Sequence, residues 1–324
     1  MESAEETAGK VWKIIIDSAN YLFNASHSVA VALDALYGAY LKAHYPMEYY
    51  STLLDSYANA GNKDKVSAIK AEMKKAFGIV VAPCRYRQDN RGFYVDKEGK
   101  KIADALHSVK YISKTIANEL YRMRNDHFDT FTDLLYDLSG RKAFNSRSIR
   151  ILIRMGYFEE FGSVGKLLTM HDEFSEGKNK VTKALVDKTK MKRLDELRKL
   201  EASLPEQDPS IEEQIAFEIE HYGTPITVSK AAKMKFAALE VETKYSPKLK
   251  MYSIATGNVG QIKILKKDFN DLPIQAGDVV KIDFYTKKPA YSYSGGQKHV
   301  IPGVYDLWVS KYSIVYRREE EETA

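Results

Sequence analysis

The sequence predicts a multidomain α+β protein in which helices come first and a small β-barrel follows. The chain has 324 residues, more than one typical domain, so it provides enough sequence for two or three cores. From Leu33 to Leu41, large apolar residues recur at the i, i+3, i+4 spacing of a helix face that turns toward a core. After position 223 the pattern changes to short runs rich in β-branched and aromatic residues, separated by turn formers.

The composition is that of an ordinary folded protein. Apolar residues make up 44% of the chain and charged residues 29%, which argues against global disorder. The single cysteine, Cys84, excludes an internal disulfide and suits a reducing compartment. No apolar run approaches the roughly 18 residues of a membrane span, and the acidic beginning has the wrong charge for a signal peptide. We therefore expect a cytoplasmic protein that does not bind membranes.

Charge is distributed unevenly along the chain. The net charge is only +5, yet the segment 140–155 holds five basic residues and no acid, and 178–199 holds nine basic residues against three acids. Residues 319–322 form an acidic tail. Because screening limits each charge to roughly 8–10 Å, local basic blocks decide phosphate binding more than the total does.

The first quarter of the chain predicts a series of helices. Residues 11–17 form a short apolar helix that we expect to pack on the Leu33 helix, which ends before Pro46. Pro46 begins the next helix, and a further helix over 69–77 stops at Gly78. A short strand at 79–82 and a small hairpin over 93–100 follow.

Two blocks in this region carry a more specific signal. Phe23-Asn24-Ala25-Ser26-His27 and the run YGAYLKAHYP over 37–46 resemble the end of the fingers in the alpha subunit of bacterial DNA polymerase III, the replicative polymerase. That family usually reads Phe-Asn-Lys-Ser-His, followed by a helix that ends Tyr-Leu-Lys-Ala-His-Tyr-Pro. With Ala25, where many members carry Lys, and with the run VALDALY over 31–37, the chain resembles the Gram-positive or phage-like branches more than the enterobacterial one. The resemblance covers nearly the whole chain, firmly for 7–60 and 140–165.

The resemblance implies a domain order. The expected parts are the end of the fingers (1–60), a helix-hairpin-helix domain that resembles the clamp-binding domain (61–165), a charged helical connector (166–222), an OB-fold (223–318) and the acidic tail (319–324). It also implies a site. Asn24, Ser26 and His27 lie at a helix entrance that attracts anions, so with Lys42 they are expected near the incoming nucleotide or the primer-template. The alternative is capping and a packed histidine.

The first helix-hairpin-helix unit is expected over 105–117. Such a motif binds the sugar-phosphate backbone of duplex DNA, through a Gly-hydrophobic-Gly turn whose main-chain N–H groups reach a phosphate. Here Tyr111 and Ser113 occupy the glycine positions, and their Cβ atoms should hinder that approach. Phosphate binding by this turn is then weaker, or Lys110 and Lys114 bind the phosphate instead. The alternative is that these lysines are only solvated. A helical stripe is expected at Val109, Ile112, Ile116 and Leu120.

The second unit, over 145–158, matches the family pattern better. Inward packing of Ile149, Leu152 and Ile153 leaves Arg147, Arg150 and Arg154 outside at helical spacing. The resemblance implies that this basic stripe binds duplex DNA. The alternative is an ordinary solvent-exposed face.

From position 224, short strands with one helix at 231–239 predict a small barrel, for which the resemblance implies an OB-fold. Such folds hold single strands by cationic side chains and aromatic stacking. The candidates for binding single strands combine these residue types: Lys287, Lys288, Tyr291, Tyr293 and Lys298. The alternative is an ordinary loop that does not bind DNA.

No catalytic or metal-binding residue is expected in this chain. A two-metal polymerase needs adjacent carboxylates, and the sequence contains no Asp-x-Asp pair. The family's Mg²⁺ ions are expected only in the palm, so no cofactor is assigned. The expected partners are primer-template duplex, single-stranded DNA, the remainder of the alpha subunit and, as a candidate, the sliding clamp. Segments 170–174 and 214–217 fit the family's clamp-binding peptide poorly, and their phenylalanines are expected in a core. Alternatives are a stand-alone, non-catalytic nucleic-acid-binding accessory protein and a module that binds replisome proteins.

Overall fold

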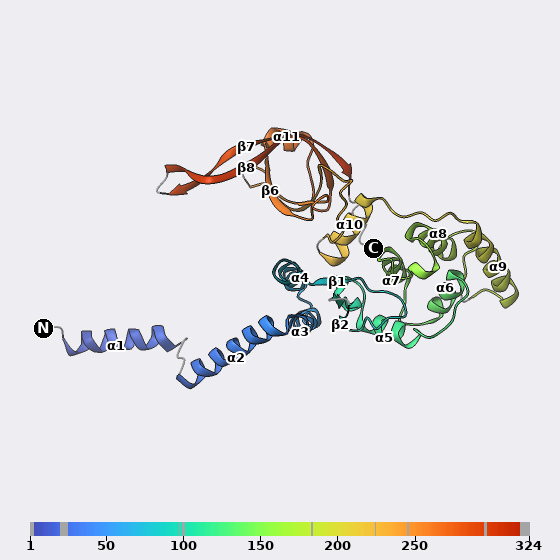
Figure 1. Cartoon of the computed structure of the whole chain (residues 1–324), viewed down its shortest axis with the longest axis horizontal. Helices are drawn as coiled ribbons and strands as arrows, with labels where there is room; N and C mark the ends of the chain where they lie inside the picture. Colours follow the sequence, from blue (N-terminus) through green and yellow to red (C-terminus); the bar gives the residue numbers. More distant parts are fainter. Residues whose placement is uncertain are drawn as a thin grey trace.

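The computed structural model describes residues 3–19, 25–96, 98, 101–182, 184–223, 225–244, 246–294 and 297–317. Figure 1 shows three parts: an N-terminal arm of two helices, a helical body and a β-barrel. None of the helices among these residues is long and apolar enough to cross a membrane. The expected class, helical parts with a small OB-like barrel, is confirmed.

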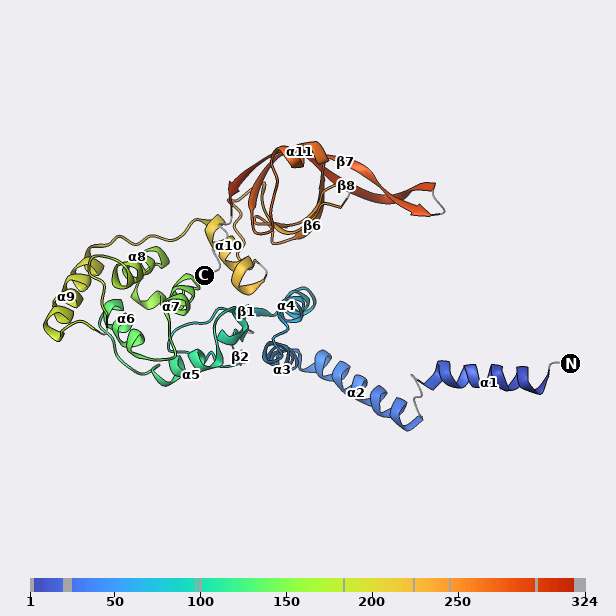
Figure 2. The same cartoon turned by 180° about the vertical axis from the view of Figure 1, so that it is seen from behind.

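The N-terminal arm consists of α1 (Ala4–Ala19) and α2 (Ala25–His44), which extend one after the other away from the body (Figures 1 and 2). The expectation that these helices pack on each other and turn an apolar face to a core is wrong for this chain. Trp12 on α1 is 63% exposed and Leu36 on α2 is 61% exposed. The described residues supply no element that covers either face, because α2 meets the body only near its C-terminal end.

After the arm, the expected local elements are confirmed. Pro46 begins α3 (Pro46–Asn59), and α4 (Lys63–Phe77) ends at Gly78, whose φ of 67° is left-handed. Three short strands follow: β1 (Val80–Ala82), β2 (Tyr94–Asp96) and β3 (Lys101–Ala103). β3 pairs antiparallel with β2 and parallel with β1. A small core between these elements includes Tyr50, Leu54, Met73 and Ile102.

The first helix-hairpin-helix unit lies where it was expected, but its turn is not helical. A 3-10 turn, η1 (Leu106–Ser108), precedes a non-helical turn, and α5 begins only at Lys114 (Lys114–Arg122). The helical stripe is therefore wrong at Val109 and Ile112, which are nevertheless buried in the turn. The helix cannot continue because the N–H of Lys110 donates to the carbonyl of His221, and Ser113 accepts from the N–H of Ile116 as an N-cap.

The helical body continues through α6 (Phe131–Gly140), α7 (Ser146–Arg154), η2 (Glu159–Phe161), α8 (Val164–Ser175), α9 (Asp187–Ser203) and α10 (Ile211–Tyr222). One hydrophobic cluster joins residues from Cys84 to Phe217. The charged segment expected as a connector, 166–222, contributes Leu167 of α8 and Leu197 of α9 to this cluster. The domain limits along the chain stay predictions.

The barrel is closed by strands β4 (Lys235–Glu242), β5 (Lys248–Ser253), β6 (Val259–Ile264), β7 (Val279–Ser294) and β8 (Gln297–Tyr316). Their order is β4-β5-β6-β8-β7, and β7 pairs back with β4. β6 and β8 are parallel, whereas the other pairs are antiparallel. The short helix α11 (Lys266–Asp271) lies between β6 and β7.

The helix expected at 231–239 is wrong, because residues from Lys235 onward form strand β4. This strand bonds to β5 on one side and to β7 on the other, and closes the barrel. Ala237 and Ala238 are fully buried there. The helical preference of alanine is small, so pairing on both edges overrides it.

Beyond the barrel wall, β7 and β8 continue as a two-stranded ribbon that projects from the barrel (Figures 1 and 2). The register shifts between Pro289 and Tyr291, and Gly303 on the opposite strand has a φ of 74°. The ribbon exposes apolar side chains, among them Val300, Val304 and Tyr305.

Candidate nucleic-acid interface

Tyr111 and Gly156 occupy the same backbone conformation in the turns of the two hairpins. Both have φ of 69°, a left-handed value that glycine adopts freely and a tyrosine rarely does. Tyr111 therefore stands where the second hairpin has a glycine. Ser113 does not, because its φ is −92° and it serves as the N-cap of α5.

Cationic side chains surround the Tyr111 ring. The guanidinium carbon of Arg147, from α7, lies 3.9 Å from the ring centre, and the ammonium nitrogen of Lys110 lies 4.7 Å from it. Tyr111 itself is 45% exposed. The His221 ring on α10 meets it edge-on, with centroids 6.4 Å apart. Lys114, the first residue of α5, is exposed.

The arginine stripe of α7 contacts three different elements. Arg147 lies over Tyr111, Arg150 pairs with Asp172 of α8, and the guanidinium carbon of Arg154 lies 5.6 Å from the centre of the Phe217 ring on α10. Arg154 is only partly exposed, whereas Arg147 is exposed. The stripe is thus not a uniform solvent face.

On the barrel, the outward Trp308 of β8 lies between two lysines. The Lys288 ammonium is 4.8 Å and the Lys263 ammonium 5.9 Å from its ring centre. Lys263 also pairs with Asp306 at 2.5 Å. Sequence reasoning assigned Lys288 to the site but missed Trp308 and Lys263, because their meeting depends on the parallel pairing of β6 with β8.

The other barrel candidates are more dispersed. Lys287 and Lys288 are neighbours on β7, where they pair with Leu307 and Asp306. Because successive side chains of a strand point to opposite faces, Lys287 lies on the other side of the strand from Lys288. Tyr291 is exposed on the ribbon. The side chains of Tyr293 and Lys298 lie outside the described residues, although their backbones pair with each other.

The hairpin segment and a larger part of the chain match known proteins. Residues 78–166 match a family model described as a helix-hairpin-helix motif, which includes both turns. Over 171 residues the chain is 34% identical to DNA polymerase III subunit alpha of Saccharopolyspora erythraea, which is 52% of this chain and 14% of that protein. The same subunit of Campylobacter jejuni is 35% identical over 164 residues, 50% of this chain and 13% of the relative.

About half of the chain is thus similar to a region of DNA polymerase III alpha subunits. The Bacillus subtilis alpha subunit is 32% identical over 162 residues, 50% of this chain and 14% of the relative. The chain therefore spans a small share of the length of the alpha subunits that it matches. Since relatives from different bacteria match at similar identity, the branch of the family stays a prediction.

The alpha-subunit resemblance also pointed to four residues near the incoming nucleotide, and of these the structure describes the side chains of His27 and Lys42, which lie far apart on one helix. Asn24 and the side chain of Ser26 lie outside the described residues. His27 is exposed, and it lies inside the first turn of α2 rather than before it. Lys42 lies 15 residues further on, about 22 Å along the helix, and pairs with Glu72 of α4. That hydrogen bond raises the pKa of Lys42 and lowers the pKa of Glu72.

The two segments weighed as clamp-binding peptides are both helical in this alpha-subunit-like chain. Met170 and Phe174 of α8 are buried, as are Ile215 and Phe217 of α10. The expectation that both phenylalanines serve as core residues is confirmed.

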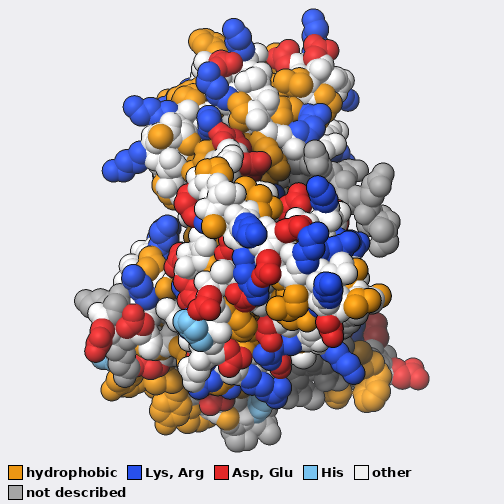
Figure 3. Space-filling view, turned by 90° about the vertical axis from the view of Figure 1, so that its right-hand side faces the viewer, with side chains coloured by type: hydrophobic (Ala, Val, Ile, Leu, Met, Phe, Trp, Pro, Cys, Tyr) orange, Lys and Arg blue, Asp and Glu red, His pale blue; other side chains and the backbone are white. Residues whose placement is uncertain are grey.

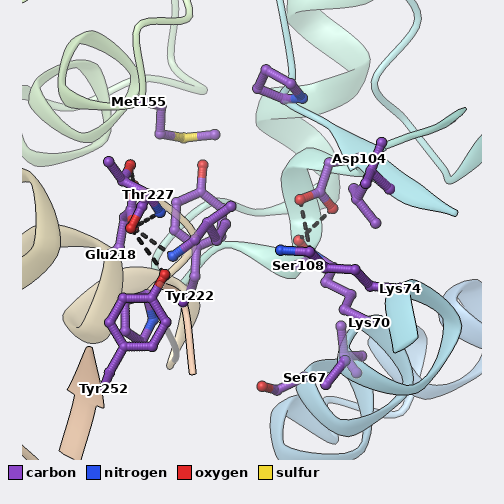
Figure 4. A pocket seen from close by; sticks show the side chains of 18 of the residues that line it. Ser67, Lys70, Lys74, Asp104, Ser108, Met155, Glu218, Tyr222, Thr227 and Tyr252 are labelled. Atoms are coloured by element: carbon purple, nitrogen blue, oxygen red, sulfur yellow. Dashed lines mark hydrogen bonds and ion pairs between the residues drawn. The ribbon is translucent and has the colours of Figure 1, made fainter. Parts of the chain in front are cut away.

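A cavity of 520 Å³ lies where α4, α10 and the barrel meet (Figure 4). Several of its charged groups have partners within the protein. The Lys70 ammonium lies 2.8 Å from the Asp104 carboxylate, and Glu218 accepts from the N–H groups of Ile226 at 2.6 Å and Thr227 at 2.8 Å. Tyr252 of β5 donates to the Thr227 carbonyl at 2.9 Å. These bonds tie the barrel to α10, so the cavity is a junction between parts of the chain.

The surface distributes its charge in small groups. Figure 3 shows Lys and Arg side chains interspersed with Asp and Glu over the face that it displays. Among the described residues no cluster of three or more metal-ligating side chains occurs. Local clusters such as Lys110 with Arg147 therefore matter more than a broad field.

Proposed function

We propose that this chain is a DNA-holding portion of a DNA polymerase III alpha subunit, in which the paired hairpins contact the primer-template duplex. The observation that carries the proposal is the pair of cations, Lys110 and Arg147, on the Tyr111 ring at the first hairpin turn, inside a segment that matches a helix-hairpin-helix model. Such motifs bind phosphates without reading the base sequence. The function is to hold the product of synthesis in place.

The barrel holds single-stranded template under the same proposal, as an OB-fold. Its strand order and its parallel β6–β8 pair support that assignment. Trp308 presents an aromatic face beside Lys288 and Lys263. Base stacking on an aromatic ring with nearby cations is the usual means by which such barrels bind single strands.

The arm binds the rest of the polymerase, which carries the palm carboxylates and their Mg²⁺ ions. Exposed contiguous apolar side chains of this kind mark a contact with another protein surface. They occur on both helices of the arm: Val11, Trp12, Ile14, Ile15 and Ile16 on α1, and Leu33, Leu36, Tyr37, Tyr40 and Leu41 on α2. The sliding clamp stays a candidate partner, through a surface other than the buried segments 170–174 and 214–217.

A second candidate function is a module that binds replisome proteins. The exposed Val300, Val304 and Tyr305 of the ribbon favour it, because apolar side chains on a projecting ribbon suit a protein partner. The two functions differ in their dependence on salt. Only DNA binding releases counterions, so only it weakens steeply as salt rises.

The test is fluorescence anisotropy with a labelled primer-template across a salt series. Each phosphate contact contributes about 0.9 to the slope of log affinity against log salt. Arg147→Ala should therefore lower the slope by about one, and replacement of Arg147, Arg150 and Arg154 together by roughly two to three. Lys110→Ala with Lys114→Ala should lower it by less than two.

Lys192→Ala on α9 is the matched control, because this lysine is 77% exposed and lies outside both hairpins. Its slope should equal that of the wild type. If the arginine variant folds normally by circular dichroism and keeps the wild-type slope, the hairpins do not hold DNA. If the wild-type chain shows no affinity for DNA at 50 mM salt, the protein-binding module is the better account.

A further inference from the structure

We propose that Tyr111 joins the two hairpins into one composite binding site for a phosphodiester, by holding Arg147 and Lys110 on its ring. The site replaces the backbone grip that a glycine turn would provide in the first hairpin. The inference rests on the proposed function, since it assigns the contact through which the hairpins hold the DNA backbone.

The first step is the conformation of the turn. Tyr111 keeps the left-handed backbone, with the same φ of 69° that Gly156 has in the second hairpin. A residue with a Cβ adopts this conformation only at an energetic cost, so it persists where surrounding contacts impose it. The first turn therefore shares the left-handed φ of the second, but it carries a large side chain at this position.

The second step is what holds the ring in place. The N–H of Lys110 donates to the His221 carbonyl at 3.0 Å, which ties the turn to α10. The His221 ring, stacked on Phe217 with centroids 4.4 Å apart, meets Tyr111 edge-on. Through these contacts Tyr111 has a fixed position between the first hairpin, α10 and the start of α7.

The third step is the pair of cations that the Tyr111 ring holds. Cations within about 6 Å of an aromatic centroid are attracted to its face, and Tyr111 holds Arg147 at 3.9 Å and Lys110 at 4.7 Å. The two cations come from different hairpins and share one ring. Two cations held on one ring favour an anion beside them, and a guanidinium offers a planar pair of donors to phosphate. Tyr111 acts here as a positioning residue and need not contact the DNA.

This geometry makes a prediction opposite to that of a simple glycine turn. If main-chain N–H groups gripped the phosphate, Tyr111→Gly would restore the approach and strengthen binding. If Tyr111 positions the cations, Tyr111→Gly should weaken duplex binding about tenfold and lower the salt slope by about one, although the turn itself is relieved of its strain.

The experiment measures primer-template binding across a salt series, together with melting temperature. Tyr111→Phe keeps the ring and should retain the wild-type affinity and slope. Tyr111→Gly should show the weaker affinity and the lower slope, and it should melt no lower than the wild type. Adding Arg147→Ala to Tyr111→Gly should cause little further loss, because the two residues act as a unit. Tyr121→Leu is the control, since it removes a ring that contacts Arg91 at 3.6 Å and Arg124 at 3.9 Å away from the hairpin turns.

Two failures are distinguishable. A wild-type chain without salt-dependent DNA binding would overturn the proposed function itself. A wild-type chain that binds, with a folded Tyr111→Gly variant that binds equally or more tightly, would overturn only the role of Tyr111. The same holds if Arg147→Ala and Tyr111→Gly lower the affinity additively.

Discussion

The carboxylate of Glu201 accepts two hydrogen bonds from Thr132, one from its backbone N–H at 2.9 Å and one from its hydroxyl at 2.6 Å. It also accepts from the N–H of Phe131 at 2.8 Å. A negative charge at the N-terminus of α6 is favourable there, and Glu201 is only 8% exposed. An acid on the charged helix α9 thus fixes that helix to the hairpin domain.

Glu201→Ala should lower the free energy of unfolding by about 3 kcal/mol, because it leaves buried N–H groups without an acceptor. Urea denaturation followed by circular dichroism measures the loss. Glu240→Ala is the control, since Glu240 is 70% exposed and pairs with Lys250 at the surface, so its effect should stay within about 0.5 kcal/mol. Equal effects of the two substitutions would contradict the role of Glu201.

Tryptophan fluorescence can test the single-strand surface, because the chain has only two tryptophans, Trp12 and Trp308. In a Trp12→Phe variant all tryptophan emission comes from Trp308. Adding an oligo-thymidine should quench this emission, because a base that stacks on the indole changes its surroundings. Lys288→Ala in the same background should weaken the titration by several-fold.

The complementary variant, Trp308→Phe, leaves only Trp12 on the arm. Its emission should not respond to the oligonucleotide. A response from Trp12 with none from Trp308 would place single strands on the arm and not on the barrel.

Two histidines, the buried His171 and the partly buried His107, should make stability depend on pH. Burial lowers the pKa of His107 and of His171 below the ordinary value of 6.5. The folded chain therefore takes up protons on these rings at a lower pH than the unfolded chain, which takes them up as the pH falls through 6.5. Stability is fully present above this pH and decreases below it, by up to about 1.4 kcal/mol per pH unit for each histidine.

Thermal melts between pH 7.5 and 5.5 measure this slope. His107→Leu should flatten it, because the substitution removes one of the two rings that take up protons. His127→Leu is the control, since His127 is 84% exposed. A slope that His107→Leu leaves unchanged would assign the pH dependence to other groups.

The exposed arm makes a prediction about stability and assembly together. Leu36→Ser on α2 should change the free energy of unfolding of the isolated chain by less than about 0.5 kcal/mol, because Leu36 is already in contact with water. Leu54→Ser on α3 should cost about 3 kcal/mol or more, because Leu54 is fully buried.

In binding to a palm-bearing polymerase fragment, the order should reverse. Leu36→Ser should weaken the complex, measured by interferometry, while a folded Leu54→Val variant should bind like the wild type. If Leu36→Ser lowers the melting temperature as much as Leu54→Ser does, the arm is part of the chain's own core.

Local sequence alone determined where many elements begin and end. Pro46 starts α3 and Gly78 ends α4 because these residues act on their own backbone angles, whatever surrounds them. The alternating runs after position 245 likewise form strands of the barrel. The two blocks near residues 23–46 were enough to identify the alpha-subunit resemblance.

Tertiary structure decided what depends on distant partners. Residues 235–239 became strand because β5 and β7 flank them, against the helical preference of their alanines. The apolar stripe of α2 predicts a buried face, but the sequence does not determine whether this chain or a partner buries it. The pairs Tyr111–Arg147 and Thr132–Glu201 join residues far apart in sequence, and no periodicity encodes such meetings, because they arise only when separate helices pack together.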